Sequence, residues 1–145
     1  MENRDRPEIQ TRRIATTKKK RVLIIDDNFD QLFLCKTILA TDDYESITAL
    51  GGREALALLS EIEKPDLILL DMQMDDMSGP EFLIMLEENC PETFKNVPVV
   101  YLTANDSVPV SKAVGFIRKP YDFDKFLSAV HRFIEIGTGP NNYKH

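Results

Sequence analysis

Chemically reactive side chains stand where short apolar runs of this sequence end. Asp26 and Asp27 follow one run, Asp71 ends a second, Thr103 ends a third and Lys119 follows a fourth. Three carboxylates brought together repel one another and raise at least one pKa unless a cation compensates them. Hard oxygen ligands suit Mg²⁺. A carboxylate, a metal, an amine and a hydroxyl are what in-line phosphoryl transfer requires, so these residue types favour a site for a phosphoryl group.

The apolar runs themselves have the character of buried strands. They are short, continuous and rich in β-branched residues, and they end abruptly at polar groups, as strands of parallel sheets do. The three clearest candidates are residues 21–27, 65–71 and 97–103, and weaker candidates are residues 44–50 and 115–118.

Segments between these runs carry apolar residues at helical spacing. Ser78 and Glu81 have the form of a capping box with Pro80 in the first turn, which predicts a helix through about Asn89. A last helix is expected from near Asp122. The apolar stripes are Leu32, Cys35 and Leu39; Ala55, Leu58, Leu59 and Ile62; and Phe123, Phe126, Leu127, Val130, Phe133 and Ile134.

The alternation of strands and helices predicts a doubly wound α/β domain. Right-handed crossovers leave few topologies other than a parallel sheet with helices on both faces. Ligands of such sheets collect beyond the carboxyl ends of the strands. If the first and third strands are neighbours, the carboxylates of Asp26, Asp27 and Asp71 meet there. Taken singly, these acids also suit a helix N-cap or a turn.

Length and charge limit the organisation of the chain. Its 145 residues suit one domain, and its apolar runs are too short to cross a bilayer. Residues 1–21 hold eight basic and three acidic residues without a signal-peptide core, which favours a cytoplasmic protein with an acidic body. We expect a solvated, disordered arm, although a basic arm also suits nucleic acid or anionic lipid.

Four groups of residues together resemble the receiver domain of two-component response regulators. They are Asp26-Asp27, the stretch LDMQMDDMSGPE at 70–81, Thr103-Ala104 and Lys119-Pro120. The resemblance covers residues 21–136. It implies a flavodoxin-like, five-stranded parallel sheet in the order 2-1-3-4-5. Outside it, we expect a basic, disordered arm at 1–20 and a disordered tail at 137–145.

The resemblance also implies a phosphoacceptor and a metal site. Asp71 would accept the phosphoryl group. Asp26 and Asp27 would hold Mg²⁺ together with Asp71, and the backbone carbonyl of Gln73 would complete the metal shell. The phosphoryl donor would be a histidine kinase or a histidine phosphotransfer protein.

Further roles follow from the same resemblance. Lys119 would pair with the phosphoryl oxygens, and Thr103 would donate a hydrogen bond to one of them. Phe116 would be the aromatic residue that swings inward together with Thr103. The small Ala104 would leave the phosphoryl group access. Such a protein is a switch that signals through protein contacts, with self-catalysed phosphoryl transfer and slow autodephosphorylation, and it is not an enzyme in the ordinary sense.

The sequence departs from the family pattern at two places. Asp75 stands where the family usually has Pro, so we expect a more flexible and more acidic loop after the acceptor, with the chemistry intact. Only twelve residues, 104–115, separate Thr103 from Phe116, which is near the minimum for a parallel crossover. The fourth helix is therefore expected to be shortened or missing, and output or dimerisation to use another surface. A short helix over 109–114 is the alternative.

Two other functions remain open. A degenerate receiver would serve only as an interaction scaffold, although retention of the five site residues argues against it. An aspartyl-phosphate phosphatase would generally place a second acid two residues after its nucleophile, where this chain has Gln73.

Overall fold

The computed structural model describes residues 18–138, which form one α/β unit. Its strands are β1 (Arg21–Ile25), β2 (Glu45–Ala49), β3 (Leu67–Asp71), β4 (Val99–Thr103) and β5 (Gly115–Arg118). Its helices are α2 (Phe29–Ala40), α3 (Gly52–Leu59), α4 (Gly79–Asn89), α5 (Pro91–Asn96) and α6 (Phe123–Thr138). No helix among the described residues is long and apolar enough to cross a membrane.

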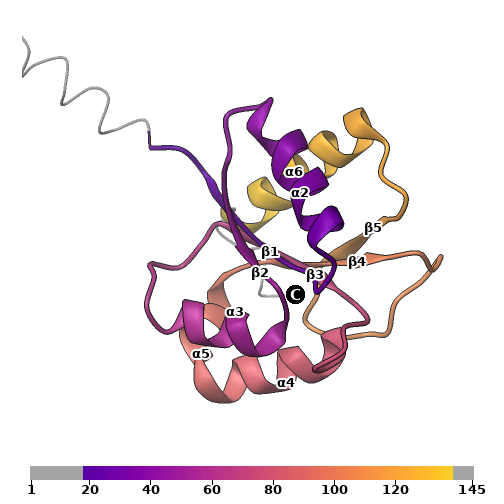
Figure 1. Ribbon diagram of the computed structural model, residues 1–145. Helices are drawn as coiled ribbons and strands as arrows, with labels where there is room; N and C mark the ends of the chain where they lie inside the picture. The colour runs from indigo at the N-terminus through magenta and orange to yellow at the C-terminus, as the bar shows by residue number, and fades with distance from the viewer. Residues whose placement is uncertain (1–17, 139–145) are drawn as a thin grey trace, which may run out of the picture.

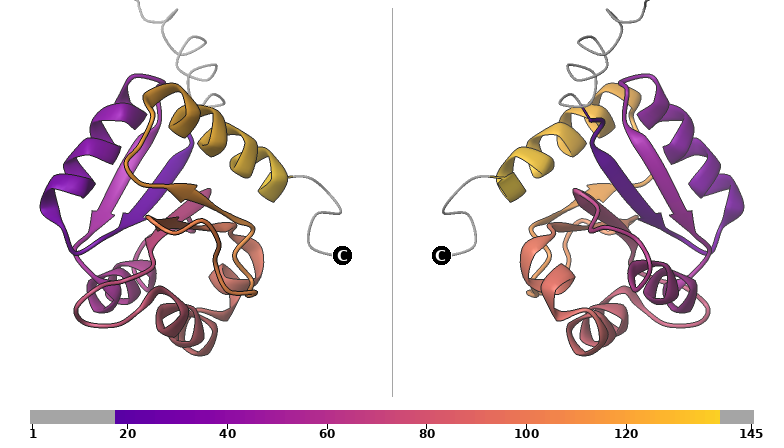
Figure 2. Two further views of the ribbon diagram at one scale, coloured as in Figure 1. Left: turned by 90° about the vertical axis from the view of Figure 1, so that its right-hand side faces the viewer. Right: turned by 90° about the vertical axis from the view of Figure 1, so that its left-hand side faces the viewer.

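The strands of the described residues form one parallel sheet in the order β2-β1-β3-β4-β5, as expected. Helices α2 and α6 cover one face, and α3, α4 and α5 cover the other (Figures 1 and 2). Each face has its own apolar core, because successive side chains of a strand point to opposite sides. Strands β3 and β4 are buried throughout, which explains their continuous apolar sequence.

The helices follow the predicted apolar stripes with small differences. Ser78 caps α4 in a capping box with Glu81, as predicted. Helix α3 ends at Leu59, so Ile62 lies beyond it. Phe123 is 47% exposed although it was expected on the buried face of α6, because it is the first residue of that helix and has little of the core beside it.

The connection from β4 to β5 contains no helix. All of residues 104–114 are described, and they form bends and extended segments (the orange segment between β4 and β5 in Figure 1). The helix that was expected to be shortened or missing is absent from residues 104–114, which confirms the prediction, and the alternative of a short helix over 109–114 is wrong. Conversely, the sequence analysis missed α5, although Pro91 stands at its first position.

Both predicted ends of the domain lie mostly outside the described residues. Of the predicted arm, residues 1–20, only 18–20 are described; Lys18 pairs with Glu63, and Lys19 pairs with Asp43. Of the predicted tail, residues 137–145, the first two belong to α6, so that helix extends two residues further than expected. Residues 139–145 lie outside the described part.

Candidate functional site

Three carboxylates converge at the carboxyl ends of β1 and β3. The two strands are neighbours, with Ile25 paired to Leu70, so Asp26 and Asp71 leave them side by side. Asp27, Asp26 and Asp71 each offer a carboxylate oxygen, and these oxygens lie within 4.8 Å of one another. Asp26 is 1% exposed and Asp71 is 7% exposed, whereas Asp27 is half-buried. The predicted acidic cluster therefore exists, at the sheet edge where it was expected.

Lys119 reaches this cluster from the end of β5. Its Nζ lies 3.3 Å from an oxygen of Asp26 and 3.3 Å from an oxygen of Asp71. Its backbone N–H donates to the carbonyl of Thr103 at 2.8 Å, which fixes its place beside β4. Burial lowers the pKa of the ammonium, but the two carboxylates outweigh burial and hold that pKa above its ordinary value. Lys119 therefore stays charged between the two acids.

One lysine does not compensate the negative charge of the cluster. Burial and the neighbouring charge of Asp26 raise the pKa of Asp71 to about 6, although Lys119 and the backbone N–H of Gln73 act in the opposite direction. An acid in such surroundings gains from a second cation. The donor atoms are hard carboxylate oxygens, which are the ligands that Mg²⁺ prefers, so the residues present fit a magnesium ion.

Thr103 ends β4 beside the cluster and is 4% exposed. Its Oγ1 accepts a hydrogen bond from the backbone N–H of Asn105 at 3.0 Å, which leaves the hydroxyl proton available to another acceptor. Thr103, Lys119 and the three acids line an open pocket of about 390 Å³. A phosphoryl group is far smaller than this pocket, so there is room for it together with metal-bound water.

The loop that follows Asp71 is held by more hydrogen bonds than expected. Gln73 forms an antiparallel bridge with Ser78, and its N–H donates to Asp71 at 3.4 Å. The backbone N–H of Asp75 donates to Oδ2 of Asp27 at 2.6 Å. We expected a looser segment because Asp75 replaces a proline, but the N–H that a proline lacks forms a bond that holds the loop.

Phe116 lies apart from the acceptor pocket. It is half-buried on β5, packs against the core on the α3 and α4 side, and lines a separate pocket of about 590 Å³ beside α6. The structure thus brings together all the predicted acceptor and metal residues and leaves the predicted aromatic switch residue outside their pocket. Ala104 lines the acceptor pocket, as its small size suggested.

The sequence analysis missed some residues of the pocket. Asn28 and Gln31 also line it, and both belong to the start of α2, where Asn28 is the N-cap. The sequence did carry a signal for Asn28, because Asn is a common N-cap residue and Asn28 stands just before an apolar helical stripe. The bond from Asp75 to Asp27 carried no sequence signal, since it joins backbone and side chain 48 residues apart.

Comparisons with known proteins agree with this geometry. The family model of the response regulator receiver domain matches residues 22–131. Sporulation initiation phosphotransferase F of Bacillus subtilis is 29% identical over 123 residues, which cover 81% of this chain and 95% of that protein. Transcriptional regulatory protein GlrR of Escherichia coli is 32% identical over 124 residues, which cover 81% of this chain. The chain spans only 27% of the length of GlrR.

A solved structure of the response regulator TrrA from Thermotoga maritima has the same fold. It is 28% identical, the TM-score is 0.68, and the match covers 79% of this chain and 98% of that one. The family match covers most of the described residues and includes every residue of the acceptor pocket. The chain therefore belongs to the receiver domain family of two-component response regulators, whose members are signalling switches and not classical enzymes.

Proposed function

We propose that this protein is a phosphorylation switch in which Asp71 accepts a phosphoryl group from a phosphohistidine. The donor is a histidine kinase or a histidine phosphotransfer protein in the cytoplasm, and phosphorylation changes the contacts of the switch with other proteins. The observation that carries the proposal is the position of Lys119, whose Nζ lies 3.3 Å from both Asp26 and Asp71 in a pocket that is open to solvent.

The proposed reaction is an in-line displacement. A carboxylate oxygen of Asp71 attacks the phosphorus of the phosphohistidine and forms an acyl phosphate, while the bond from phosphorus to the imidazole nitrogen breaks. Lys119, already beside the acceptor carboxylate, neutralises charge on the phosphoryl oxygens. The hydroxyl of Thr103 donates a hydrogen bond to one of the phosphoryl oxygens. Its own oxygen accepts from the backbone N–H of Asn105, so its proton is free to point at the phosphoryl group. Catalysis here is positioning together with charge neutralisation.

Asp26, Asp27, Asp71 and the carbonyl of Gln73 would hold one Mg²⁺. The raised pKa of Asp71 supports this assignment, because that carboxylate lacks sufficient positive charge nearby. The solved structure of the similar protein TrrA is a complex with Mg²⁺ and BeF, which supports it further. When bound, the ion supplies positive charge for the oxygens of the transferring group and of its acceptor.

The proposed switch couples Thr103 to Phe116. Phosphorylation would draw the Thr103 hydroxyl toward the phosphoryl group and leave space into which Phe116 turns. Phe116 pairs with Tyr101 across β4 and β5, two residues before Thr103. Phe116 is half-buried, so an inward movement of its ring would remove further aromatic surface from water.

Intact mass after incubation with Mg²⁺ and a small phosphodonor tests the proposal. We expect one phosphoryl adduct on the wild-type protein, its loss in Asp71→Ala, and its loss when EDTA removes the metal. Asp30→Ala is the matched control, because Asp30 is an exposed acid in the first turn of α2 and should leave the adduct intact. No adduct on the wild type, or an undiminished adduct on Asp71→Ala, would contradict the proposal and leave the scaffold alternative.

A further inference from the structure

Each carboxylate of the proposed metal site receives a hydrogen bond from a backbone N–H. Asp26 accepts from Asn28 at 2.9 Å, and Asp71 accepts from Gln73 at 3.4 Å. Asp27 accepts from Asp75 at 2.6 Å. The first two donors lie two residues beyond their acceptors in the chain, whereas the third reaches across from the loop between β3 and α4. The orientation of Asp27 therefore depends on where that loop is held.

The residue type at position 75 decides whether this third bond exists. The receiver family usually has a proline here, and a proline has no backbone N–H to donate. The bond to Asp27 is thus a consequence of the departure of this chain from its family. It acts on the most exposed of the three carboxylates, which has the most freedom to turn away from the cluster.

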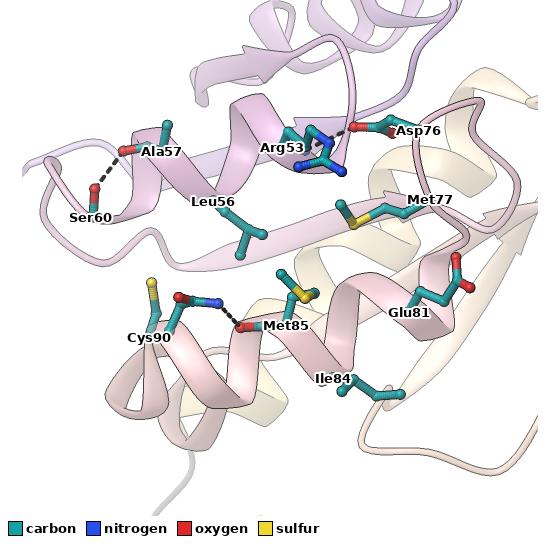
Figure 3. Close-up of a pocket in the computed structure, with 11 residues that line it drawn as sticks. Arg53, Leu56, Ala57, Ser60, Asp76, Met77, Glu81, Ile84, Met85 and Cys90 are labelled. Atoms are coloured by element: carbon teal, nitrogen blue, oxygen red, sulfur yellow. Dashed lines mark hydrogen bonds between the residues drawn. The ribbon is translucent and has the colours of Figure 1, made fainter.

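Hydrogen bonds of the next residue, Asp76, keep the backbone N–H of Asp75 in place. The side chain of Asp76 accepts a hydrogen bond from the backbone N–H of Arg53 at 2.9 Å (Figure 3). It accepts a second from the backbone N–H of Gly52 at 3.2 Å. These bonds cap α3, whose own N-cap residue, Gly51, has no side chain to do so. Gly51 has a φ of 155°, which other residues rarely adopt, and a Cβ there would lie 3.0 Å from Oδ2 of Asp76, so a larger residue would strain the backbone and crowd this cap.

The pKa of Asp76 agrees with its role as a helix cap. Burial pushes the pKa of Asp76 upward, but the backbone N–H groups of Arg53 and Gly52 outweigh burial and hold that pKa below its ordinary value. The carboxylate is therefore charged when it caps the helix, where the helix dipole favours negative charge. Because the side chain of Asp76 is bonded to the start of α3, the adjoining N–H of Asp75 is held within reach of Asp27.

We propose that the backbone N–H of Asp75 is a positioning group for the metal site. By holding Oδ2 of Asp27, it directs the other carboxylate oxygen toward the cluster and prepares the site for a divalent cation. This inference rests on the proposed function, since it assigns to Asp27 a role in binding Mg²⁺. Hydrogen bonds that orient metal ligands in this way commonly change metal affinity by about 10- to 100-fold.

Two substitutions at position 75 separate the N–H from the side chain. Asp75→Pro removes both the carboxylate and the N–H, whereas Asp75→Ala removes the carboxylate alone. We expect Mg²⁺, titrated calorimetrically in the absence of phosphodonor, to bind Asp75→Pro about tenfold more weakly than Asp75→Ala. Equal affinities in the two variants would overturn the inference. No binding to the wild type would instead overturn the proposed metal site.

A measurement without metal keeps the inference testable if the proline variant folds poorly. The amide of Asp75 should exchange with solvent about fivefold or more faster in Asp27→Ala than in the wild type, both in EDTA, because the variant lacks the acceptor. The amide of Gln73, which donates to Asp71, serves as the internal reference. Unchanged exchange of the Asp75 amide would show that the bond does not persist in solution and would overturn the inference, whatever the outcome with Mg²⁺.

Discussion

Two crossovers of this sheet make the same parallel connection in different ways. The chain passes from β3 to β4 through α4 and α5, but it passes from β4 to β5 through residues 104–114, which contain no helix. Helix α4 contributes the buried Phe82, Leu83 and Leu86 to the core. The second crossover reaches full exposure at Val110. Burial of an apolar helix face holds the first crossover, whereas the second adds to the two cores only the partly buried Val108, Ala113 and Val114.

Side-chain bonds to the backbone hold the second crossover instead. The ammonium of Lys112 donates to the carbonyls of Phe94 and Val97, at and just beyond the end of α5, and lies 5.0 Å from the centre of the Phe94 ring. A cation at a helix C-terminus satisfies carbonyls that have no partner within the helix. Helix α5, which the sequence analysis missed, therefore holds residues 104–114 in place through Lys112.

The difference matters for the proposed acceptor site because Thr103 stands at the start of the second crossover and Lys119 follows β5, the strand to which that crossover leads. Helix α4, with its capping box and buried face, fixes the loop that carries Gln73 and Asp75. Residues 104–114, in contrast, form no helix, and none of their side chains is fully buried. We expect slower hydrogen exchange in the loop that carries Gln73 and Asp75 than in residues 104–114.

Removing a core side chain from the first crossover should have the largest effect. Phe82→Ala should lower the free energy of unfolding by about 3–5 kcal/mol, because it leaves a cavity in the fully buried core under α4. Val110→Ala in the second crossover should change it by less than about 0.5 kcal/mol. Urea denaturation measures both. Similar losses in the two variants would show that burial also holds the second crossover.

Removing the lysine tether should have an intermediate effect. Lys112→Met leaves the two carbonyls without this donor and should cost about 1–3 kcal/mol in urea denaturation. Hydrogen exchange over residues 104–114 should become faster, while exchange over α4 should change little. Uniform acceleration over both segments would mean that Lys112 supports the whole domain and not one crossover.

The same lysine predicts a pH dependence. Burial lowers the pKa of Lys112 to about 8, below the value of about 10.4 for an unfolded lysine. Between these values the unfolded chain binds more protons than the folded protein, so this group makes the folded protein more stable as the pH rises. Relative to Lys112→Met, the wild type should therefore gain stability from pH 8 to pH 10. An unchanged difference across this range would contradict the lowered pKa.

Loss of the helix cap in the first crossover should have a smaller effect. The Ser78 hydroxyl accepts from the backbone N–H of Glu81 at 3.1 Å, and Ser78→Ala should cost about 1 kcal/mol. Ser107→Ala, at an exposed serine of the second crossover, is the matched control and should be near neutral. Thermal melts compare the two variants, and an equal loss would remove the cap as an explanation for the order of α4.

The smallest effect is expected for the surface ion pair of the second crossover. Arg118 pairs with Asp106, and both side chains are more than half exposed. Such pairs contribute about 0–1 kcal/mol, so Asp106→Ala should change stability by less than about 0.5 kcal/mol at moderate salt. A loss of stability comparable to that of Lys112→Met would show that the ion pair also holds this loop in place.

Much of the fold followed from local pattern. The β-branched runs, the capping box at Ser78 and the apolar stripes indicated the strands and most helices within a few residues, because they reflect periods of two and 3.6 residues that burial imposes. The convergence of the predicted site residues was also predictable, because the carboxyl ends of parallel strands meet on one side of the sheet. Helix α5 was not, because its six residues are too few to show a period.

Contacts between distant segments set the rest. Local sequence determined that the five polar residues stand at or just beyond the carboxyl ends of strands, because each comes where an apolar run stops; they are Asp26, Asp27, Asp71, Thr103 and Lys119. The folded chain alone determined that Asp75 donates to Asp27 and that Lys112 seats on α5, because each bond needs two segments to approach to within about 3 Å, a distance that no local period encodes.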